Sequence, residues 1–219
     1  SNGLLVRLVE DHEVPLVWLR LEFGAGAWAD PPGQEGLAAV TMDMLDRRTQ
    51  TLDERTLSKK KRRLACTLST YAHRNGSTLS ASSLSSNLDE TLDLVTEVLR
   101  QPTFHAGDLR GDLKGRTLGL EKESLQPSSL CRRALLRVLY GDVYRGRTPS
   151  EESYSRIPAS DLRAWANRHL HPGDAILMVG GDTSMEQIVP MLEERLGDWE
   201  AGAKTIPPRI TPTQPVPMA

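Results

Sequence analysis

The sequence holds five histidines, the side chains best suited to bind a transition metal or to move a proton near neutral pH: His12, His73, His105, His169 and His171. No two of them are four residues apart, which is the spacing that places two imidazoles on one face of a helix for zinc. His169 and His171 are two residues apart, so on a helix they would point in nearly opposite directions. The histidines by themselves therefore predict no zinc site.

Motifs of other enzyme classes are also missing from the sequence. It contains no G-x-S-x-G nucleophile elbow and no G-x-x-x-x-G-K-[ST] phosphate loop. The run Gly180-Gly181-Asp182 follows an apolar segment but lacks the third glycine of a dinucleotide-binding fingerprint. Cys66 and Cys131 form no C-x-x-C pair and are too few for a disulfide framework, so we expect both to be small buried apolar residues.

The composition excludes several classes of protein. The 219 residues carry 27 Lys and Arg against 29 Asp and Glu, so the chain lacks the positive charge of a dedicated nucleic-acid-binding protein. Five consecutive cations at 59–63 have no interleaved aromatic residues, and we interpret them as a solvated helix end. No apolar run approaches the roughly 18 residues of a membrane span, and no signal peptide is recognised. Since the chain could be a piece of a longer protein, its compartment stays unassigned.

Alternating apolar and polar residues predict strands that come in pairs. The runs 3–9 and 17–23 flank a polar turn, and we predict that they form a hairpin. The runs 64–72 and 79–83 flank Asn75-Gly76, which is a strong hairpin signal. The apolar run 175–179 predicts one buried strand. Because helical segments separate the strands, we predict an α+β fold with an antiparallel sheet of about 4–6 strands packed against helices.

Apolar residues at helical spacing predict the helices that surround this sheet. The expected segments are 36–45, 51–63, 87–101, 128–140, 160–170 and 184–199. Capping-box patterns mark the starts at Thr51, Asn87 and Ser184. We predict that residues 1–206 form one module and that the proline-rich segment 207–219 is a linker to a following module.

Glycine recurs at every fourth position between 105 and 124, at Gly107, Gly111, Gly115 and Gly119. On a helix these residues would form one bare stripe, each at a cost of about 1 kcal/mol relative to alanine. Two interpretations stay open. The stripe either allows another backbone to approach closely, or it marks a loosened and partly irregular helix.

Short runs in a fixed order span nearly the whole chain. Among them are Pro32-Gly33-Gln34-Glu35-Gly36-Leu37-Ala38, the segment 87–94, Val179-Gly180-Gly181-Asp182, and Leu196-Gly197-Asp198-Trp199. Their order and spacing resemble the first-half module of the insulinase, pitrilysin and mitochondrial-processing-peptidase family of zinc metallopeptidases. The resemblance implies the metallohydrolase-like α/β roll of the processing-peptidase type.

Active members of that family carry an inverted zinc motif, H-x-x-E-H, directly after the Gly-Leu-Ala. Two histidines bind zinc and the glutamate activates the water. In this sequence Ala39 stands at the first ligand position and offers only a methyl group. Met42 stands at the base position with a thioether, and Asp43 at the second ligand position with a single carboxylate. The third ligand position falls on glycine or leucine, next to a glutamate. The degenerate zinc-site positions are, in that order, Ala39, Met42, Asp43, Gly119 or Leu120, and Glu121.

These positions predict no catalytic residue, no cofactor-binding residue and no zinc, although zinc is expected in active relatives. The resemblance implies a module that pairs with a zinc-bearing family subunit or module, by self- or hetero-association, to enclose peptide in a chamber. The Ser-rich run 79–87 would line part of its wall. Family members also take up peptide by strand addition to a sheet edge, and the sequence does not show which edge is free. The resemblance further places the glycine stripe beside the motif helix, so a close approach to Ala38 and Ala39 is expected.

Two alternatives stay open at this point. One is an active zinc metallopeptidase whose rearranged ligands are Asp43, Glu121 and a histidine. The other is a pure assembly module without substrate contact, recognisable by a large apolar patch. The sequence identifies neither the partner nor the peptides.

Overall fold

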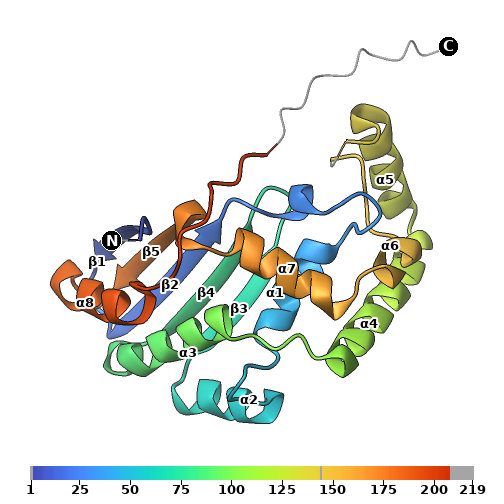
Figure 1. Cartoon of the computed structure of the whole chain (residues 1–219). Helices are drawn as coiled ribbons and strands as arrows, with labels where there is room; N and C mark the ends of the chain where they lie inside the picture. Colours follow the sequence, from blue (N-terminus) through green and yellow to red (C-terminus); the bar gives the residue numbers. More distant parts are fainter. Residues whose placement is uncertain (1, 144, 208–219) are drawn as a thin grey trace.

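A five-stranded sheet lies at the centre of the computed structural model, which describes residues 2–143 and 145–207 (Figure 1). Its strands lie in the order β1-β5-β2-β4-β3. Their bounds are Leu5–Glu10 (β1), Leu16–Phe23 (β2), Thr67–Ala72 (β3), Ser77–Leu84 (β4) and Ala175–Gly181 (β5). The predicted alternation is clearest on β2, where Val17, Leu19, Leu21 and Phe23 are buried.

The predicted hairpin between the first two strands is wrong. β5 lies between them, parallel to β1 and antiparallel to β2. In this register Gly180 pairs with Trp18, and a Cβ on Gly180 would lie only 2.4 Å from the Trp18 ring. A turn between two strands predicts only that consecutive strands pair. It could not predict that β5, which is distant in sequence, lies between β1 and β2. The second predicted hairpin is confirmed, since β3 and β4 pair antiparallel.

Helices cover one face of the sheet and extend beyond its β3 edge (Figure 1). They are Leu37–Leu45 (α1), Glu54–Arg63 (α2), Leu88–Arg100 (α3), Ala106–Ser124 (α4), Pro127–Tyr140 (α5), Glu151–Ser155 (α6), Ala159–His169 (α7) and Met185–Leu196 (α8). The main core lies between the sheet and the helices α1, α3, α7 and α8, whose apolar faces are buried against it. The predicted α+β class is confirmed.

Two of the predicted helix starts differ in detail. The cap of α2 is Asp53, whose Oδ1 accepts the Thr56 N–H at 2.7 Å, two residues later than the box predicted at Thr51. Asn87 precedes α3, but its side chain donates to the Leu64 carbonyl at 3.0 Å and makes no capping bond. The capping box at the start of α8 is present as predicted.

Three of the five cations at the end of α2 pair with neighbouring carboxylates. The ion pairs are Lys60–Glu97, Lys61–Asp46 and Arg63–Glu90. Charges that are paired in this way offer little to an external phosphate, which supports the interpretation of the run as a solvated helix end.

The glycine stripe lies on a regular helix but faces no other backbone. A Cβ placed on Gly111, Gly115 or Gly119 would meet no atom within 4 Å. The other side of α4, which carries Leu109 and Leu113, packs against the core. α4 and α1 are neighbours, but the predicted close approach of the stripe to Ala38 and Ala39 is wrong. The alternative of an irregular helix is also wrong.

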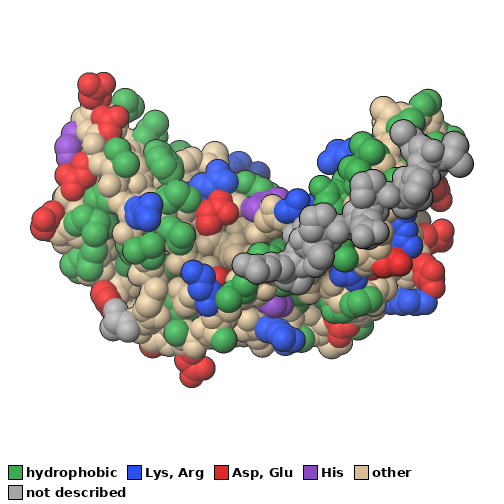
Figure 2. Space-filling model, turned by 90° about the horizontal axis from the view of Figure 1, so that it is seen from above, with side chains coloured by type: hydrophobic (Ala, Val, Ile, Leu, Met, Phe, Trp, Pro, Cys, Tyr) green, Lys and Arg blue, Asp and Glu red, His purple; other side chains and the backbone are tan. Residues whose placement is uncertain are grey.

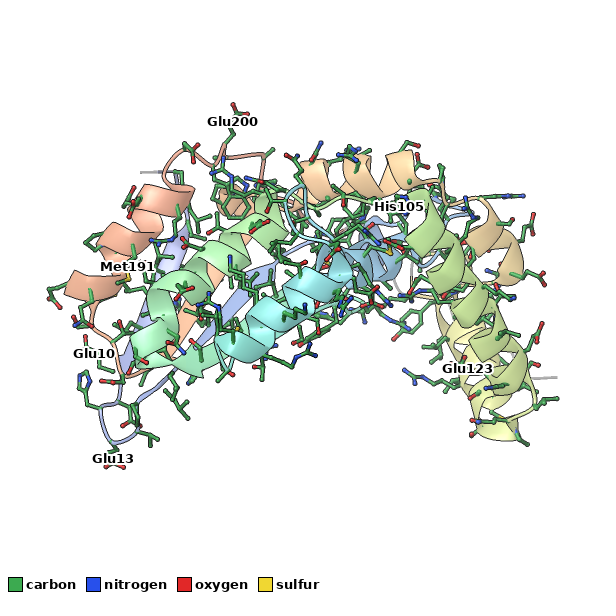
Figure 3. The ribbon with its side chains drawn as sticks, turned by 90° about the horizontal axis from the view of Figure 1, so that it is seen from below. Glu10, Glu13, His105, Glu123, Met191 and Glu200 are labelled. Atoms are coloured by element: carbon green, nitrogen blue, oxygen red, sulfur yellow. The ribbon has the colours of Figure 1, made fainter. Side chains whose placement is uncertain are left out.

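The opposite face of the sheet is open to solvent over its β1, β5 and β2 strands. Figure 2 shows apolar side chains gathered over this end of the molecule, and a hollow between it and the arm formed by α4 and α5. In Figure 3 the acidic turn of Glu10 and Glu13 and the arm carrying Glu123 lie at opposite ends. Exposed apolar residues of the sheet include Leu5, Leu16, Trp18 and Ile176.

Three smaller predictions have different outcomes. Cys66 is buried as expected, but Cys131 is exposed on α5, because that helix turns its apolar side away from the core. The predicted linker 207–219 lies, apart from its first residue, outside the described residues. Among the described residues, no helix has the length and apolar character needed to cross a lipid bilayer.

Candidate functional site

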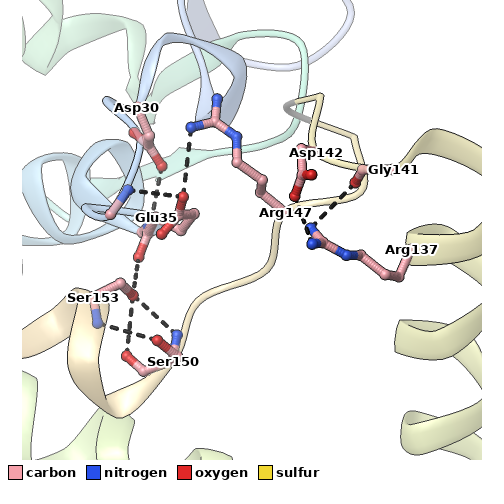
Figure 4. Close-up of polar contacts among 10 residues, drawn as sticks. Asp30, Glu35, Arg137, Gly141, Asp142, Arg147, Ser150 and Ser153 are labelled. Atoms are coloured by element: carbon pink, nitrogen blue, oxygen red, sulfur yellow. Dashed lines mark hydrogen bonds and ion pairs between the residues drawn. The ribbon is translucent and has the colours of Figure 1, made fainter.

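The helix α1 carries the positions that the resemblance identifies with the zinc motif, and a buried aspartate fixes its start. Asp30, labelled in Figure 4, accepts the backbone N–H groups of Gly36 and Ala38, both at 2.8 Å. Burial raises the pKa of Asp30 to about 7, although these two bonds favour the charged form. Gly36 has φ +104°, and a Cβ on it would lie 2.6 Å from the Tyr154 ring, so only glycine fits there.

The segment before α6 holds the start of α1 from the other side. Arg147 pairs with the Glu35 carboxylate at 3.4 Å, and the Ser153 hydroxyl donates to the Glu35 carbonyl at 2.9 Å. Ser150 and Ser153 form a reciprocal capping box at the start of α6 (Figure 4). The start of α1 is thus rigidly positioned even though the motif it carries is degenerate.

The three motif positions on α1 do not form a metal-binding face. Ala39 is half-buried and offers no donor atom in its side chain. Met42, at the position of the general base, is completely buried in the core, and its carbonyl accepts the Thr70 hydroxyl at 2.7 Å. Only Asp43 turns a charged group toward the space between α1 and α4.

An arginine from α4 fills that space. The Nε of Arg116 donates to Oδ2 of Asp112 at 2.6 Å, and a terminal nitrogen donates to the carboxylate of Asp43. The same terminal nitrogen lies 3.5 Å from the carbonyl oxygen of Ala39. One guanidinium therefore contacts both α1 positions at which active relatives are expected to place histidine ligands.

The electrostatics of this cluster favour a permanent charge on the arginine. Burial opposes the charged form, but the carboxylates of Asp112 and Asp43 outweigh it and raise the pKa of Arg116. Burial raises the pKa of the Tyr154 phenol, which faces the same guanidinium, and Arg116 partly opposes that effect. The cluster is thus a polar link between α1, α4 and α6.

The later predicted positions lie further along α4. Leu120 packs against the core, Gly119 is bare, and Glu121 is exposed. Among the described residues there is no cluster of three or more His, Cys, Asp and Glu side chains arranged to hold a metal ion. The structure does not bring Asp43, Glu121 and a histidine together, so it gives no support to the rearranged zinc site.

The sequence did not identify Arg116 and Asp112, the ion pair that fills the space between α1 and α4. A signal was available, because they are four residues apart and of opposite charge, in a segment for which a helix was one of the interpretations left open. The sequence could not show that this surface pair faces Asp43 from another helix.

The cluster lies beside the free edge of the sheet. β3 is the terminal strand on this side and, in the part of the chain that the structure describes, pairs with β4 alone. A groove of about 640 Å³ lies between α4 and α1, and a second of about 440 Å³ runs along β3. The two share Asp43, Arg47 and Glu54, so they meet at the degenerate site.

His105 caps the start of α4 and lies 3.9 Å from Asp108, which lines the groove, whereas His12, His169 and His171 lie elsewhere. His12 Nδ1 is 2.8 Å from Oδ1 of Asp182, whose Oδ2 accepts the Ser85 hydroxyl at 2.6 Å. Since the carboxylate stands between the hydroxyl and the imidazole, this is not the order of a catalytic triad. His169 and His171 are buried at the end of α7.

Family models match most of the chain. The model described as Insulinase (Peptidase family M16) matches residues 5–149, and the model described as Peptidase M16 inactive domain matches residues 156–218. The beta subunit of mitochondrial-processing peptidase from Caenorhabditis elegans is 23% identical over 141 residues. That alignment covers 62% of this chain and 30% of that protein.

Solved structures share the fold along nearly the whole chain. A peptidase M16 inactive domain from Pseudomonas fluorescens is 24% identical with a TM-score of 0.87, over 99% of this chain and 52% of that chain. A protease from Helicobacter pylori is 15% identical with a TM-score of 0.85, over 98% of this chain and 52% of that one. The periplasmic protease PqqL from Escherichia coli is 16% identical with a TM-score of 0.79, over 95% of this chain and 24% of that one. The chain thus spans about half or less of the length of these relatives.

Proposed function

We propose that this chain, which belongs to the insulinase family of peptidases, is a non-catalytic module. It pairs with another module of the family and helps to hold peptide. The observation that carries this proposal is the chemistry of α1: a methyl group at position 39 and a buried thioether at position 42. Neither can bind zinc as a histidine does, and Met42 cannot accept a proton from water.

The residues present do not fit the metal that the family implies. Zinc requires three or four donors at close range, and only the carboxylate of Asp43 remains among the motif positions. That carboxylate is already bonded to Arg116. We therefore derive no hydrolytic step for this module.

Pairing with a second module is supported by length and by surface. The relatives of known structure named above are about twice as long as this chain or longer. Two apolar surfaces are exposed at opposite ends of the module, one on α5 and one on the open sheet face (Figure 2). On α5, Leu130 is 49% exposed, Leu135 56% and Val138 70%, and apolar side chains gathered on one helix in this way are typical of a contact surface.

Peptide binding is supported by the free edge of β3. A terminal strand presents unpaired backbone groups to an added strand, and the two grooves give that strand space. The Ser-rich strand β4 contributes hydroxyls beside it: Ser80 bonds Ser69 at 2.9 Å, and Ser82 bonds Thr67 at 2.6 Å. We propose that this hydroxyl-rich patch forms the wall that faces the peptide.

Two measurements on the purified chain test the proposal. The chain with added zinc is incubated with a mixed library of peptides, and no cleavage beyond a chelator-treated control is expected. Binding is measured with a fluorescent extended peptide and with the same peptide N-methylated at alternate residues, which removes the donors for strand addition. We expect the N-methylated peptide to bind at least about tenfold more weakly, because several backbone bonds are lost.

The alternative functions give different results. Chelator-sensitive cleavage would show an active peptidase. Equal or undetectable binding of both peptides would indicate that the chain is an assembly module without substrate contact.

A further inference from the structure

The cluster around Arg116 has a role beyond structural support, and the argument rests on the proposed non-catalytic function. We propose that the Arg116 guanidinium is a built-in cation that stands in place of the metal of active relatives, links α1 to α4, and excludes divalent metal from this site.

The contacts place the charge where a metal would bridge the two helices. The guanidinium reaches the Asp43 side chain and the Ala39 carbonyl on one helix, and Asp112 on its own helix. Positions 39 and 43 are one helical turn apart, which is the spacing of a metal-binding pair. Arg116 therefore contacts both ends of the degenerate motif without needing a ligand side chain at position 39.

The chemistry of the side chain suits this task. A guanidinium is planar, stays charged at all accessible pH values, and donates in a fork that matches two carboxylate partners at once. The side chain of Arg116 is 19% exposed and that of Asp112 only 11%, so most of the cluster is removed from water. A buried charge of this kind must be paired, and here it is paired twice.

The two carboxylates that contact Arg116 are already paired with a cation. The carboxylates of Asp43 and Asp112 face Arg116, and Arg47 lies 3.8 Å from Asp112. The other two carboxylates of this groove, Glu54 and Asp108, are paired with Arg47 at 3.7 Å and with Arg48 at 2.9 Å. A divalent ion entering this site would have to displace a tethered cation and would be repelled by it.

Zinc binding by a variant with restored ligands tests this inference. A39H/D43H creates an i, i+4 histidine pair, and it is compared with A39H/D43H/R116M. We expect removal of the guanidinium to raise zinc affinity by about tenfold or more, measured by competition with a chromophoric chelator. A39H/D43H/R116K keeps the charge without the fork, and we expect it to bind zinc as weakly as the arginine form.

The controls make the outcome decisive. A39H/D43H/R110M removes an exposed arginine of the same helix and should leave zinc affinity unchanged; circular dichroism shows whether each variant is folded. Equal zinc affinity with and without Arg116 in folded protein would overturn the inference. If R116M does not fold, tight zinc binding by the lysine form would also overturn it.

Failure of this inference and failure of the proposed function can be told apart. Zinc-dependent cleavage by the unaltered chain would refute the proposed function. An inactive unaltered chain together with unchanged zinc affinity would refute only the role of Arg116.

Discussion

Arg116 and Asp112 form a bond of 2.6 Å within α4, and the other side of the same guanidinium holds Asp43 on α1. A pair that would be a minor surface contact on an isolated helix is here largely buried and joins two helices. The contribution of this pair to the free energy of unfolding therefore differs from that of an ordinary exposed i, i+4 pair.

Replacing Arg116 with methionine should lower the free energy of unfolding by about 1–3 kcal/mol. The substitution keeps an unbranched apolar stem but leaves the mostly buried carboxylate of Asp112 without its nearest cation. Urea denaturation measures the change, and R110M on the exposed side of the same helix should alter stability by less than about 0.5 kcal/mol. Equal effects of the two substitutions would contradict the central position of Arg116.

The glycines of α1 and α4 should respond to alanine in opposite directions. G36A places a Cβ against Tyr154 at a residue with φ +104°, so we expect a loss of about 1–3 kcal/mol. G111A adds a methyl group in open space on a regular helix, so we expect a gain of about 0.5–1 kcal/mol. Thermal unfolding of the two variants provides the comparison. A destabilised G111A would show that the stripe meets a neighbour after all.

The exposed apolar face of α5 should tolerate charge in the isolated module. L135E/V138E replaces two apolar side chains that are more than half exposed, so the free energy of unfolding should change by less than about 0.5 kcal/mol. Binding of a hydrophobic dye should fall, and solubility should rise. L162E, at a fully buried position of α7, is the contrasting variant and should unfold the protein. A large loss of stability in L135E/V138E would mean that this face packs within the module.

Local patterns were sufficient to predict most of the fold. The alternation on β2, the Asn75-Gly76 turn and the apolar spacing of α3 all depend on neighbours in sequence, and each was confirmed. The position of β5 and the direction of the glycine stripe depend on contacts between distant segments, and both were mispredicted. The loss of the zinc ligands could be predicted from the residue types at positions 39, 42 and 43. The position of Arg116 could not, because this arginine contacts the site from another helix.

His169 should make the protein less stable in acid. Burial, followed by Arg168 and His171, lowers the pKa of His169 to about 4, against an ordinary value of 6.5. The unfolded chain binds a proton on this imidazole at a higher pH than the folded chain does. The stabilising contribution of the neutral ring is therefore complete above about pH 6.5 and is lost as the pH falls toward 4.

The size and origin of this effect can be measured with one variant. H169Q removes the titrating group while keeping a polar side chain near Trp165, whose ring lies 4.9 Å from the imidazole. Between pH 6.5 and pH 4 the unaltered chain should lose on the order of 2–3 kcal/mol more than H169Q in urea denaturation. H73Q, at an exposed histidine, should keep the full dependence on pH. Parallel pH profiles for H169Q and the unaltered chain would show that His169 is not the group responsible, because the dependence arises from the proton that this imidazole binds when the module unfolds.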